Sequence, residues 1–504
     1  MNTKLTIAAA GAISLQLMQT TVAATDKQPN VLFIITDQQS LNTISAYKGI
    51  TPENYCETPN MDKLVERGTS FMNCYCPNPG SMPSRFAMFT GVYGGAYEIR
   101  SNNGKHLTKE KVTPVIKSNA MGWSFANAGY ETIYGGKTHL AFAGLSGKGV
   151  SMHGHPDAYG FSTYLGEDER GKTAKKAADL LRNRKSSDKP FLMVTSFINP
   201  HDICMEGTVH KSKDKYPKAT SNKLEERVGM VKTVRAEMAA IDREEFFAKH
   251  APHLPYNFEP TAGYPEVSKR VSEKFTDEYW RQYRWVYKRL VSKVDDHIGT
   301  ILDGLDANPA VKKNTIIVFV SDHGEMQGAH RAITKGYPYD ECQQVPLIIV
   351  GGGAKANAKV DLLVSGVDIY PTLCELTGVK SPEKMDGVSL AAVAKGKSKK
   401  IARDVVYGEN QTFVNVVKGD YKYTYFDLDD KEMLVNLKSD PGEMQNLLTT
   451  DSAKYRKVAD ELRSDLMKIY EPRKAAMMVE SEFTAKAKAE AKAKAAAANK
   501  AKKK

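Results

Sequence analysis

The chain has 504 residues, 41% of them hydrophobic and 26% charged. This balance is typical of a folded globular protein and excludes a disordered, collagen-like or polytopic membrane chain. The length allows two or more domains, or one large α/β sheet with a smaller appendage, and the formal net charge of +12 would suggest an acidic partner if it were spread over the fold.

The N-terminus has the pattern of a secretory signal over residues 1–24. Lys4 precedes an apolar run at residues 5–18, and Ala23 and Ala24 are small residues suited to cleavage. The run is shorter than the ~20 residues needed to span a bilayer, and no later stretch is long enough. We therefore expect a periplasmic or secreted protein without a stable membrane anchor.

Three short apolar runs predict strands buried on both faces of a sheet, at residues 31–35, 191–197 and 316–320. Polar residues follow each run directly. In an open α/β sheet, sites form outside the carboxyl ends of the strands, so these polar residues can converge in space. They are Asp37 and Gln38 after the first run, His201 after the second, and Asp322 and His323 after the third.

Helical patterns lie between these runs. Thr58 is expected to cap a helix that has Pro59 at its first position and stops at Gly68. A second helix is expected to begin just after Ser81 and to stop at Gly91. The other predicted helices are a long amphipathic one at residues 278–305 and a shorter one at residues 367–376.

The pattern changes after about residue 400, so we expect a catalytic domain at residues 25–400 and a smaller α+β domain at residues 401–475. The smaller domain is predicted to hold strands at residues 414–417 and 421–426 and a helix at residues 453–470. Within the first domain, residues 206–274 are charged and punctuated by Pro, and we interpret them as an insertion over the site. Its aromatic residues include Tyr216, Tyr256, Phe258 and Tyr264.

Residues 476–504 form a tail rich in Ala and Lys. Eight Lys and one Glu lie at residues 485–504, so these residues supply more than half of the net charge of +12. A nucleic-acid binder would instead place basic residues on a folded element among aromatic ones. We interpret the tail as a solvated, frayed or transiently helical extension, and we expect no nucleic-acid partner.

The most informative motif is Ser-Met-Pro-Ser-Arg at residues 81–85, closed by Thr90 and Gly91. Ser81 stands before a predicted helix, whose free N–H groups and dipole favour an anion, and Arg85 lies one turn away. Taken alone, the motif would fit a plain helix N-cap. In its context it resembles the signature of the formylglycine-dependent sulfatases, in which the first Ser or Cys is oxidised to Cα-formylglycine.

Further motifs in the order of that family lie between Pro29 and Leu447. The resemblance implies an alkaline-phosphatase-like α/β fold, with a large, mostly parallel sheet sandwiched by helices and a smaller C-terminal α+β domain that contains an antiparallel sheet. It also implies that Ser81 becomes formylglycine (3-oxoalanine). The modifying partner would be a serine-type anaerobic sulfatase maturase.

The resemblance implies one Ca²⁺, held by Asp37, Gln38, Asp322, His323 and the modified Ser81. Many members of the family have Asp-Asp and Asp-Asn at these two pairs. Gln38 keeps an oxygen ligand but lacks the charge, and His323 offers an imidazole nitrogen, which suits calcium less well than zinc or manganese. The identity of the ion is therefore an expectation to be tested.

An anion site follows from the same resemblance. Arg85 and Lys335 would offset charge on the sulfate group, while Lys137 would bind both formylglycine and sulfate. His139 would assist the formylglycine hydroxyl, and His201 would bind sulfate and protonate the leaving group. Arg100 and His106 follow the nucleophile segment and are candidates for substrate binding, although ordinary loop polarity also explains them.

We expect a sulfatase that hydrolyses sulfate esters, exo-acting on sulfated glycans of the glycosaminoglycan or mucin kind. A secreted address gives access to saccharides, and the insertion could wall a pocket for a sugar ring. A choline sulfatase and a phosphonate monoester or phosphodiester hydrolase of the same superfamily are the alternative enzymes. A sulfated-glycan binding protein with unmodified Ser81 is the alternative outside enzymes.

Overall fold

An eight-stranded sheet organises the protein. The computed structural model describes residues 28–104, 107–141, 156–168, 170–206, 222–260 and 275–501, so the predicted signal segment lies outside the described residues. The strand order is β4-β3-β5-β1-β6-β7-β2-β8, and β7 alone runs antiparallel to its neighbours. The strands are β1 (Asn30–Asp37), β2 (Gly68–Tyr75), β3 (Glu131–Gly136), β4 (Thr163–Tyr164), β5 (Phe191–Pro200), β6 (Thr315–Ser321), β7 (Leu347–Val350) and β8 (Ala358–Ser365).

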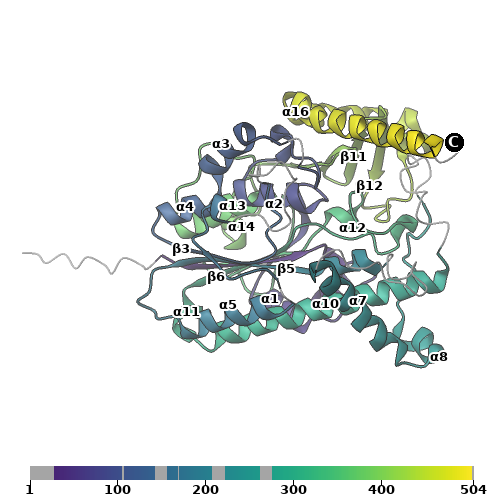
Figure 1. Cartoon of the computed structure of the whole chain (residues 1–504). Coiled ribbons are helices and arrows are strands. Elements are labelled where there is room, and N and C mark those ends of the chain that lie inside the picture. The colour runs from purple at the N-terminus through teal and green to yellow at the C-terminus, as the bar shows by residue number, and fades with distance from the viewer. Residues whose placement is uncertain are drawn as a thin grey trace, which may run out of the picture.

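Helices cover both faces of this sheet (Figure 1). Alternate residues of β1 show why: Phe33 packs into one buried cluster and Ile34 into another, as the two-residue period of a strand requires. One face carries α2 (Ser81–Thr90), α3 (Lys109–Asn119), α4 (Met121–Asn127), α13 (Ile369–Thr377) and α14 (Ala391–Ala394). The other carries α1 (Pro59–Arg67), α5 (Lys172–Asn183), α10 (Asp277–Asp306) and α11 (Pro309–Lys313).

The three predicted strands are confirmed as β1, β5 and β6, and they are neighbours in the centre of the sheet. Asp37 pairs in register with Pro200, and Thr36 pairs with Ser321. The polar residues that follow the three strands therefore meet at one edge. The parallel register positions the site.

The predicted helices after Ser81 and at residues 278–305 are confirmed as α2 and α10. The helix from Pro59 also ends where expected, but its start differs in detail, because the Thr58 hydroxyl accepts a hydrogen bond from Ser45 N (2.8 Å) instead of capping α1. Gly68 ends the helix by starting β2, and its φ of −137° is extended. The helix predicted from residue 367 begins at Ile369, after a short 3₁₀ turn.

A second, four-stranded antiparallel sheet of order β12-β11-β10-β9 forms the C-terminal region, as predicted. Its strands are β9 (Val405–Glu409), β10 (Val414–Lys418), β11 (Tyr421–Phe426) and β12 (Lys431–Asn436), followed by α15 (Leu447–Thr450) and α16 (Ser452–Ala501). The predicted strands at residues 414–417 and 421–426 correspond to β10 and β11. Short α12 (Asp340–Gln343) lies between β6 and β7 in the chain.

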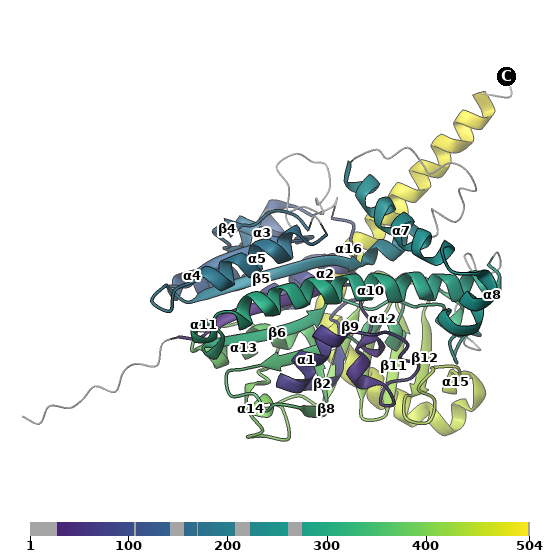
Figure 2. The same ribbon diagram turned by 90° about the horizontal axis from the view of Figure 1, so that it is seen from below.

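Helix α16 is much longer than the segment predicted at residues 453–470. It continues through Pro472 into the Ala/Lys-rich tail, and its end extends away from the sheets (Figure 2). Ala and Lys are strong helix formers, and elongation of an existing helix avoids the cost of nucleation. Helical structure therefore persists well beyond the last residues that pack on the second sheet.

The insertion at residues 206–274 is partly helical, with α7 (Asn222–Ala239), α8 (Arg243–Glu245) and a π-helical turn at Phe246–His250. It packs against α10 around Phe246 and Trp285. Buried Glu206, which follows β5, forms an ion pair of 2.7 Å with Arg235 of α7. Tyr216 and Tyr264 lie outside the described residues. In the part of the chain that the structure describes, no helix has the length and apolarity needed to cross a bilayer.

Candidate active site

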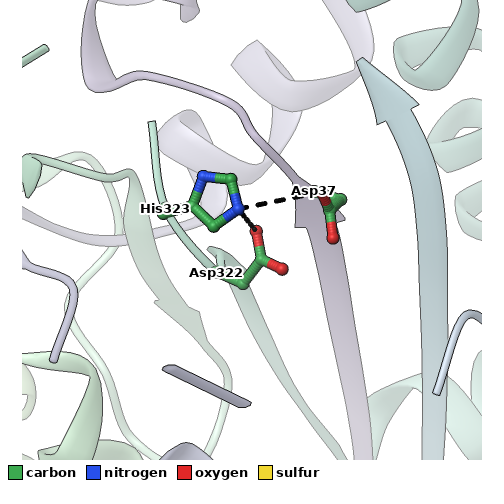
Figure 3. A group of neighbouring side chains, drawn as sticks. All are labelled: Asp37, Asp322 and His323. Atoms are coloured by element: carbon green, nitrogen blue, oxygen red, sulfur yellow. Dashed lines mark ion pairs between the residues drawn. The ribbon is translucent and has the colours of Figure 1, made fainter. Parts of the chain in front are cut away.

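Two carboxylates and an imidazole meet at the carboxyl edge of the large sheet. Asp37 ends β1, and Asp322 and His323 follow β6; all three are buried, and their ligand atoms lie within 4.8 Å of one another. In Figure 3 the His323 ring points toward both carboxylates. His323 Nε2 is 3.6 Å from Asp322 Oδ1 and 3.9 Å from Asp37 Oδ1.

Arg85 of α2 ties the two carboxylates together from the other side. Its Nε donates to Asp322 Oδ2 (2.8 Å), and a terminal nitrogen donates to Asp37 Oδ2 (3.0 Å). The remaining nitrogen donates to Ser196 Oγ (2.7 Å) and the Lys137 carbonyl (3.2 Å). A planar guanidinium suits this role because it presents several donors in a fixed geometry.

Positive charge surrounds Asp37. Lys137 Nζ forms an ion pair with Oδ2, while His201 Nε2 lies 3.9 Å and Lys335 Nζ 4.0 Å from Oδ1. Burial alone would raise the pKa of Asp37, but these charges and that of Arg85 hold the pKa well below its usual value. Asp37 is therefore ionised at neutral pH.

The surroundings shift the pKa values of two further buried groups, Asp322 and Lys137, in opposite directions. Burial and the neighbouring charge of Asp37 raise the pKa of Asp322 to about 7. Burial lowers the pKa of Lys137 to about 8, although Asp37 opposes the shift. Such shifted pKa values are typical of functional sites. Two adjacent buried carboxylates of this kind would be stabilised by a bound cation.

His323 has a defined tautomer. Its Nδ1 lies 2.9 Å from the Gly324 carbonyl, which can only accept, so Nδ1 carries the hydrogen and Nε2 presents a lone pair. Burial and the charge of Lys335 lower the pKa of His323 well below its usual value, so the ring is neutral. Asp37 Oδ1 is buried and accepts no hydrogen bond from any described residue. This donor set fits a divalent cation, with Asp37, Asp322 and His323 as ligands.

The Ser81 hydroxyl faces this cluster. Ser81 is the first residue of α2, and its Oγ lies 3.0 Å from His323 Nε2. The N-cap position belongs to Gly80, and the amide of Met82 donates to Asn102 Oδ1 (2.9 Å) instead of to a serine hydroxyl. The plain N-cap interpretation of the motif is therefore wrong for Ser81.

Gln38 lies beside the cluster. Its backbone φ of 67° is uncommon for residues other than glycine. Its backbone N donates to Asp322 Oδ1 (3.1 Å). Its side-chain oxygen accepts a hydrogen bond from Lys335 Nζ (2.8 Å), and its side-chain nitrogen donates to the carboxylate of Glu325. No sequence motif points to Glu325, whose only signal is its place two residues after His323.

Lys137 and His139 follow β3 directly. Both residues are buried, and burial together with the charge of Lys137 lowers the pKa of His139 well below its usual value. His139 is therefore a neutral imidazole that can accept a proton. Its Nδ1 makes no hydrogen bond with the described residues.

The structure places Arg100 in a different contact. Its side chain is fully buried and pairs with Asp427 of the C-terminal region at 2.8 Å, and it also donates to the Met477 carbonyl (3.4 Å). This arrangement favours a structural link between the two sheets over substrate binding. His106 lies outside the described residues.

Comparisons with known proteins agree with this geometry. The model of the family described as "Sulfatase" matches residues 29–379, and the one described as "N-sulphoglucosamine sulphohydrolase, C-terminal" matches residues 328–472. A Delta 4,5-hexuronate-2-O-sulfatase from Bacteroides thetaiotaomicron is 29% identical over 476 residues, 88% of this chain and 89% of the relative. The solved structure of a 2-O GAG sulfatase has a TM-score of 0.69 at 26% identity, covering 89% of this chain and 93% of that one.

A phosphonate monoester hydrolase of Agrobacterium radiobacter has the same fold, with a TM-score of 0.64 at 21% identity over 88% of this chain and 96% of that one. The expected alkaline-phosphatase-like architecture is thus confirmed. The family model covers more than half of the chain, from before Asp37 to beyond Lys335. The chain accordingly belongs to the sulfatase family and is a sulfuric ester hydrolase.

Proposed function

We propose that this sulfatase removes sulfate from sulfated saccharides, using formylglycine formed from Ser81 and one bound metal ion, with calcium as the expected ion. The observation that carries the proposal is the place of Ser81 Oγ, 3.0 Å from His323 Nε2 at the edge of the buried Asp37 and Asp322 pair. A residue modified at this position would lie against the metal ligands. Gln38, from the predicted ligand set, contributes to the same wall of the site.

Hydrated formylglycine would supply the oxygen nucleophile, and the bound cation would activate it and offset the charge of the sulfate group. The chain's own residues perform the rest. Lys137 and Lys335 bind sulfate oxygens, and Arg85 keeps the two carboxylates in place. His201 gives a proton to the leaving alkoxide, and neutral His139 takes a proton from the formylglycine hydroxyl when sulfate is released.

The chemistry is tested first on Ser81 itself. Conversion to formylglycine lowers the residue mass by about two units, so mass spectrometry of the peptide reports it. We expect conversion in the native host, by a serine-type anaerobic maturase, and an inactive folded protein in a host that lacks one. Ser81→Ala should lose turnover but still hold substrate through Lys137, His201 and Lys335. Full turnover by protein whose Ser81 is entirely unmodified would contradict the proposal.

The substrate class that we propose is a sulfated glycan of the glycosaminoglycan kind, attacked from its end. Support comes from the relatives, a hexuronate-2-O-sulfatase and a 2-O GAG sulfatase, each matching almost the whole chain. Helix α7 of the insertion is anchored near His201, where it can contribute to a saccharide pocket. Arg100 is left out of this pocket by its pairing with Asp427. Residues 1–24 would direct the protein to the periplasm or outside the cell.

A panel of mono-sulfated mono- and disaccharides, assayed beside choline sulfate and a nitrophenyl sulfate, tests the substrate class. We expect a saccharide to be turned over with the highest kcat/KM. If choline sulfate is turned over efficiently and no saccharide is, the glycan assignment is wrong while the sulfatase assignment stands. If a protein with unmodified Ser81 binds sulfated glycans and hydrolyses none, the binding-protein alternative holds.

Two observations favour a second activity. The Asp322 and His323 pair and the fold shared with a phosphonate monoester hydrolase are compatible with phosphonate or phosphate esters as minor substrates. The ratio of kcat/KM for nitrophenyl sulfate to that for a nitrophenyl phosphonate monoester measures the preference. A ratio below one would make the phosphonate activity the principal one.

A further inference from the structure

Glu325 is a buried carboxylate that stands behind the site and has no part in the chemistry proposed above. It is fully buried, and it accepts hydrogen bonds at both oxygens. Oε1 accepts from the Tyr283 hydroxyl (2.7 Å) and from the amide of Thr334 (2.6 Å). Oε2 accepts from the side-chain nitrogen of Gln38. Three different segments of the chain therefore fix this carboxylate in one place.

Glu325 determines the orientation of the Gln38 side-chain amide. A carboxylate can only accept, so the Gln38 NH₂ group must face it, and the Gln38 oxygen must face the other way. Besides Glu325 and Lys335, the amide has a third neighbour, the Cys204 thiol, 3.4 Å from both the oxygen and the nitrogen. A thiol is a weak donor and a weak acceptor, so it does not select an orientation.

The oriented oxygen of Gln38 holds Lys335. Lys335 Nζ donates to it at 2.8 Å, whereas the distance from Nζ to Asp37 Oδ1 is 4.0 Å, too long for a hydrogen bond. A lysine ammonium sits on a flexible four-carbon stem, so one good acceptor largely determines where it lies. Lys335 is also 12% exposed, at the open side of the cluster.

We propose that Glu325 is a positioning residue for the reaction: it orients the Gln38 amide, which in turn holds the Lys335 ammonium where the sulfate group binds. The inference rests on the proposed role of Lys335 in binding sulfate. It assigns Gln38 a task in addition to any contact with the metal. Glu325, which lies behind Gln38, thereby sets the position of the Lys335 ammonium in the site.

The test is an exchange of the two side chains. In Glu325→Gln, the Thr334 amide can only donate and so keeps the oxygen of the new side chain, which leaves the new NH₂ group facing Gln38. The Gln38 amide can then no longer both donate to position 325 and accept from Lys335. Losing a hydrogen bond to a charged group should raise KM for a sulfate ester about ten- to hundredfold. Adding Gln38→Glu restores the pairing, because the carboxylate introduced at position 38 can accept from the amide introduced at position 325 and from Lys335. The double variant should recover KM to within about fivefold of the parent.

Two control variants make the result specific. Glu341→Gln removes a nearby carboxylate that accepts from Asn257 (2.7 Å) and should leave KM unchanged. Lys335→Ala should raise KM as much as Glu325→Gln does. All assays use the full, formylglycine-containing enzyme with nitrophenyl sulfate, alongside thermal melts and metal content.

Each outcome decides the inference. Rescue by the exchange, with normal metal content in all variants, supports it. If Lys335→Ala raises KM and Glu325→Gln does not, or if the double variant is no better than Glu325→Gln, the inference is overturned. If Lys335→Ala leaves KM unchanged, the proposed role of Lys335 in the site fails instead. If Glu325→Gln does not fold, Gln38→Glu is compared with the double variant. Two facing carboxylates should make Gln38→Glu the weaker enzyme, and equal or better activity would overturn the inference.

Discussion

Arg85 and Asp322 form an ion pair from which solvent is excluded, with 2.8 Å between Arg85 Nε and Asp322 Oδ2 and no exposed surface on either side chain. The pair joins α2, which carries Ser81, to the end of β6, which carries His323. Arg85 also reaches Asp37. The segment that carries the proposed nucleophile and the proposed metal ligands are thus held as one unit.

This relationship predicts a large loss of stability when Arg85 is removed. Arg85→Met leaves buried Asp322 without its ion-pair partner and removes one of the partners of Asp37, which keeps Lys137. The loss should lower the free energy of unfolding by about 3–5 kcal/mol. Urea denaturation in the presence of a chelator measures the change without a contribution from metal. Arg67→Met is the matched control, because its pair with Asp306 is about one-third exposed and should contribute at most about 1 kcal/mol. Equal losses in the two variants would contradict the expectation.

Metal binding should depend on Asp322. Asp322→Asn keeps the size of the side chain but removes a charged ligand, so metal content measured by elemental analysis should fall strongly, and turnover with it. Asp303→Asn, at an exposed position of α10, is the control and should keep both. Activity lost to a chelator should return with calcium. Recovery with zinc or manganese alone would show that His323 selects a different ion. An empty site in fully active enzyme would refute metal dependence.

Stability should fall as pH rises through the range in which Glu409 ionises. Glu409 of β9 accepts from the Gly95 amide (2.6 Å) and the Tyr407 hydroxyl (3.0 Å), and burial raises its pKa to about 7. The folded protein therefore binds this proton more tightly than the unfolded chain, where the pKa is about 4.3. The resulting stability is complete below the unfolded pKa and is lost as pH rises through the folded one.

Glu409→Gln isolates this contribution from that of other buried carboxyls. Between pH 5 and 8, the parent should lose on the order of 3 kcal/mol more unfolding free energy than the variant, since one pKa unit corresponds to about 1.4 kcal/mol. Chemical denaturation of both proteins at the two pH values measures the difference. Identical pH dependence would show that Glu409 is ionised throughout the range.

The C-terminal tail should be dispensable for stability beyond Met477. Met477 is the last buried side chain among those that the structure describes, and it packs against Gly95 and Tyr407. A chain that ends after Glu482 should unfold at the same denaturant concentration as the parent. A chain that ends after Pro472 loses the Met477 contacts and should be destabilised by about 2–5 kcal/mol, as for other buried Met side chains. If the chain that ends after Glu482 is also less stable than the parent, residues 483–504 contribute to the stability of the fold.

Local patterns were enough for the central strands and several of the helices. The apolar runs at residues 31–35, 191–197 and 316–320 became central strands, because a strand covered by helices on both faces must be apolar on both. The ends of α2 and α10 followed from the sequence as well. The end of α16 did not, since helix continuation into an Ala/Lys tail depends on the docked turns that precede it.

The sequence by itself determined the chemistry of this protein and the order of its parts. Parallel strands bring their carboxyl ends to one edge, so Asp37, His201 and Asp322 had to meet once those strands formed. The tertiary structure alone decided what each side chain contacts. Gln38 lies 297 residues from Lys335 and 287 from Glu325, and Arg100 is paired with distant Asp427. Such partners are chosen by packing between distant segments, where burial makes an unpaired polar group costly, and no local pattern records that choice.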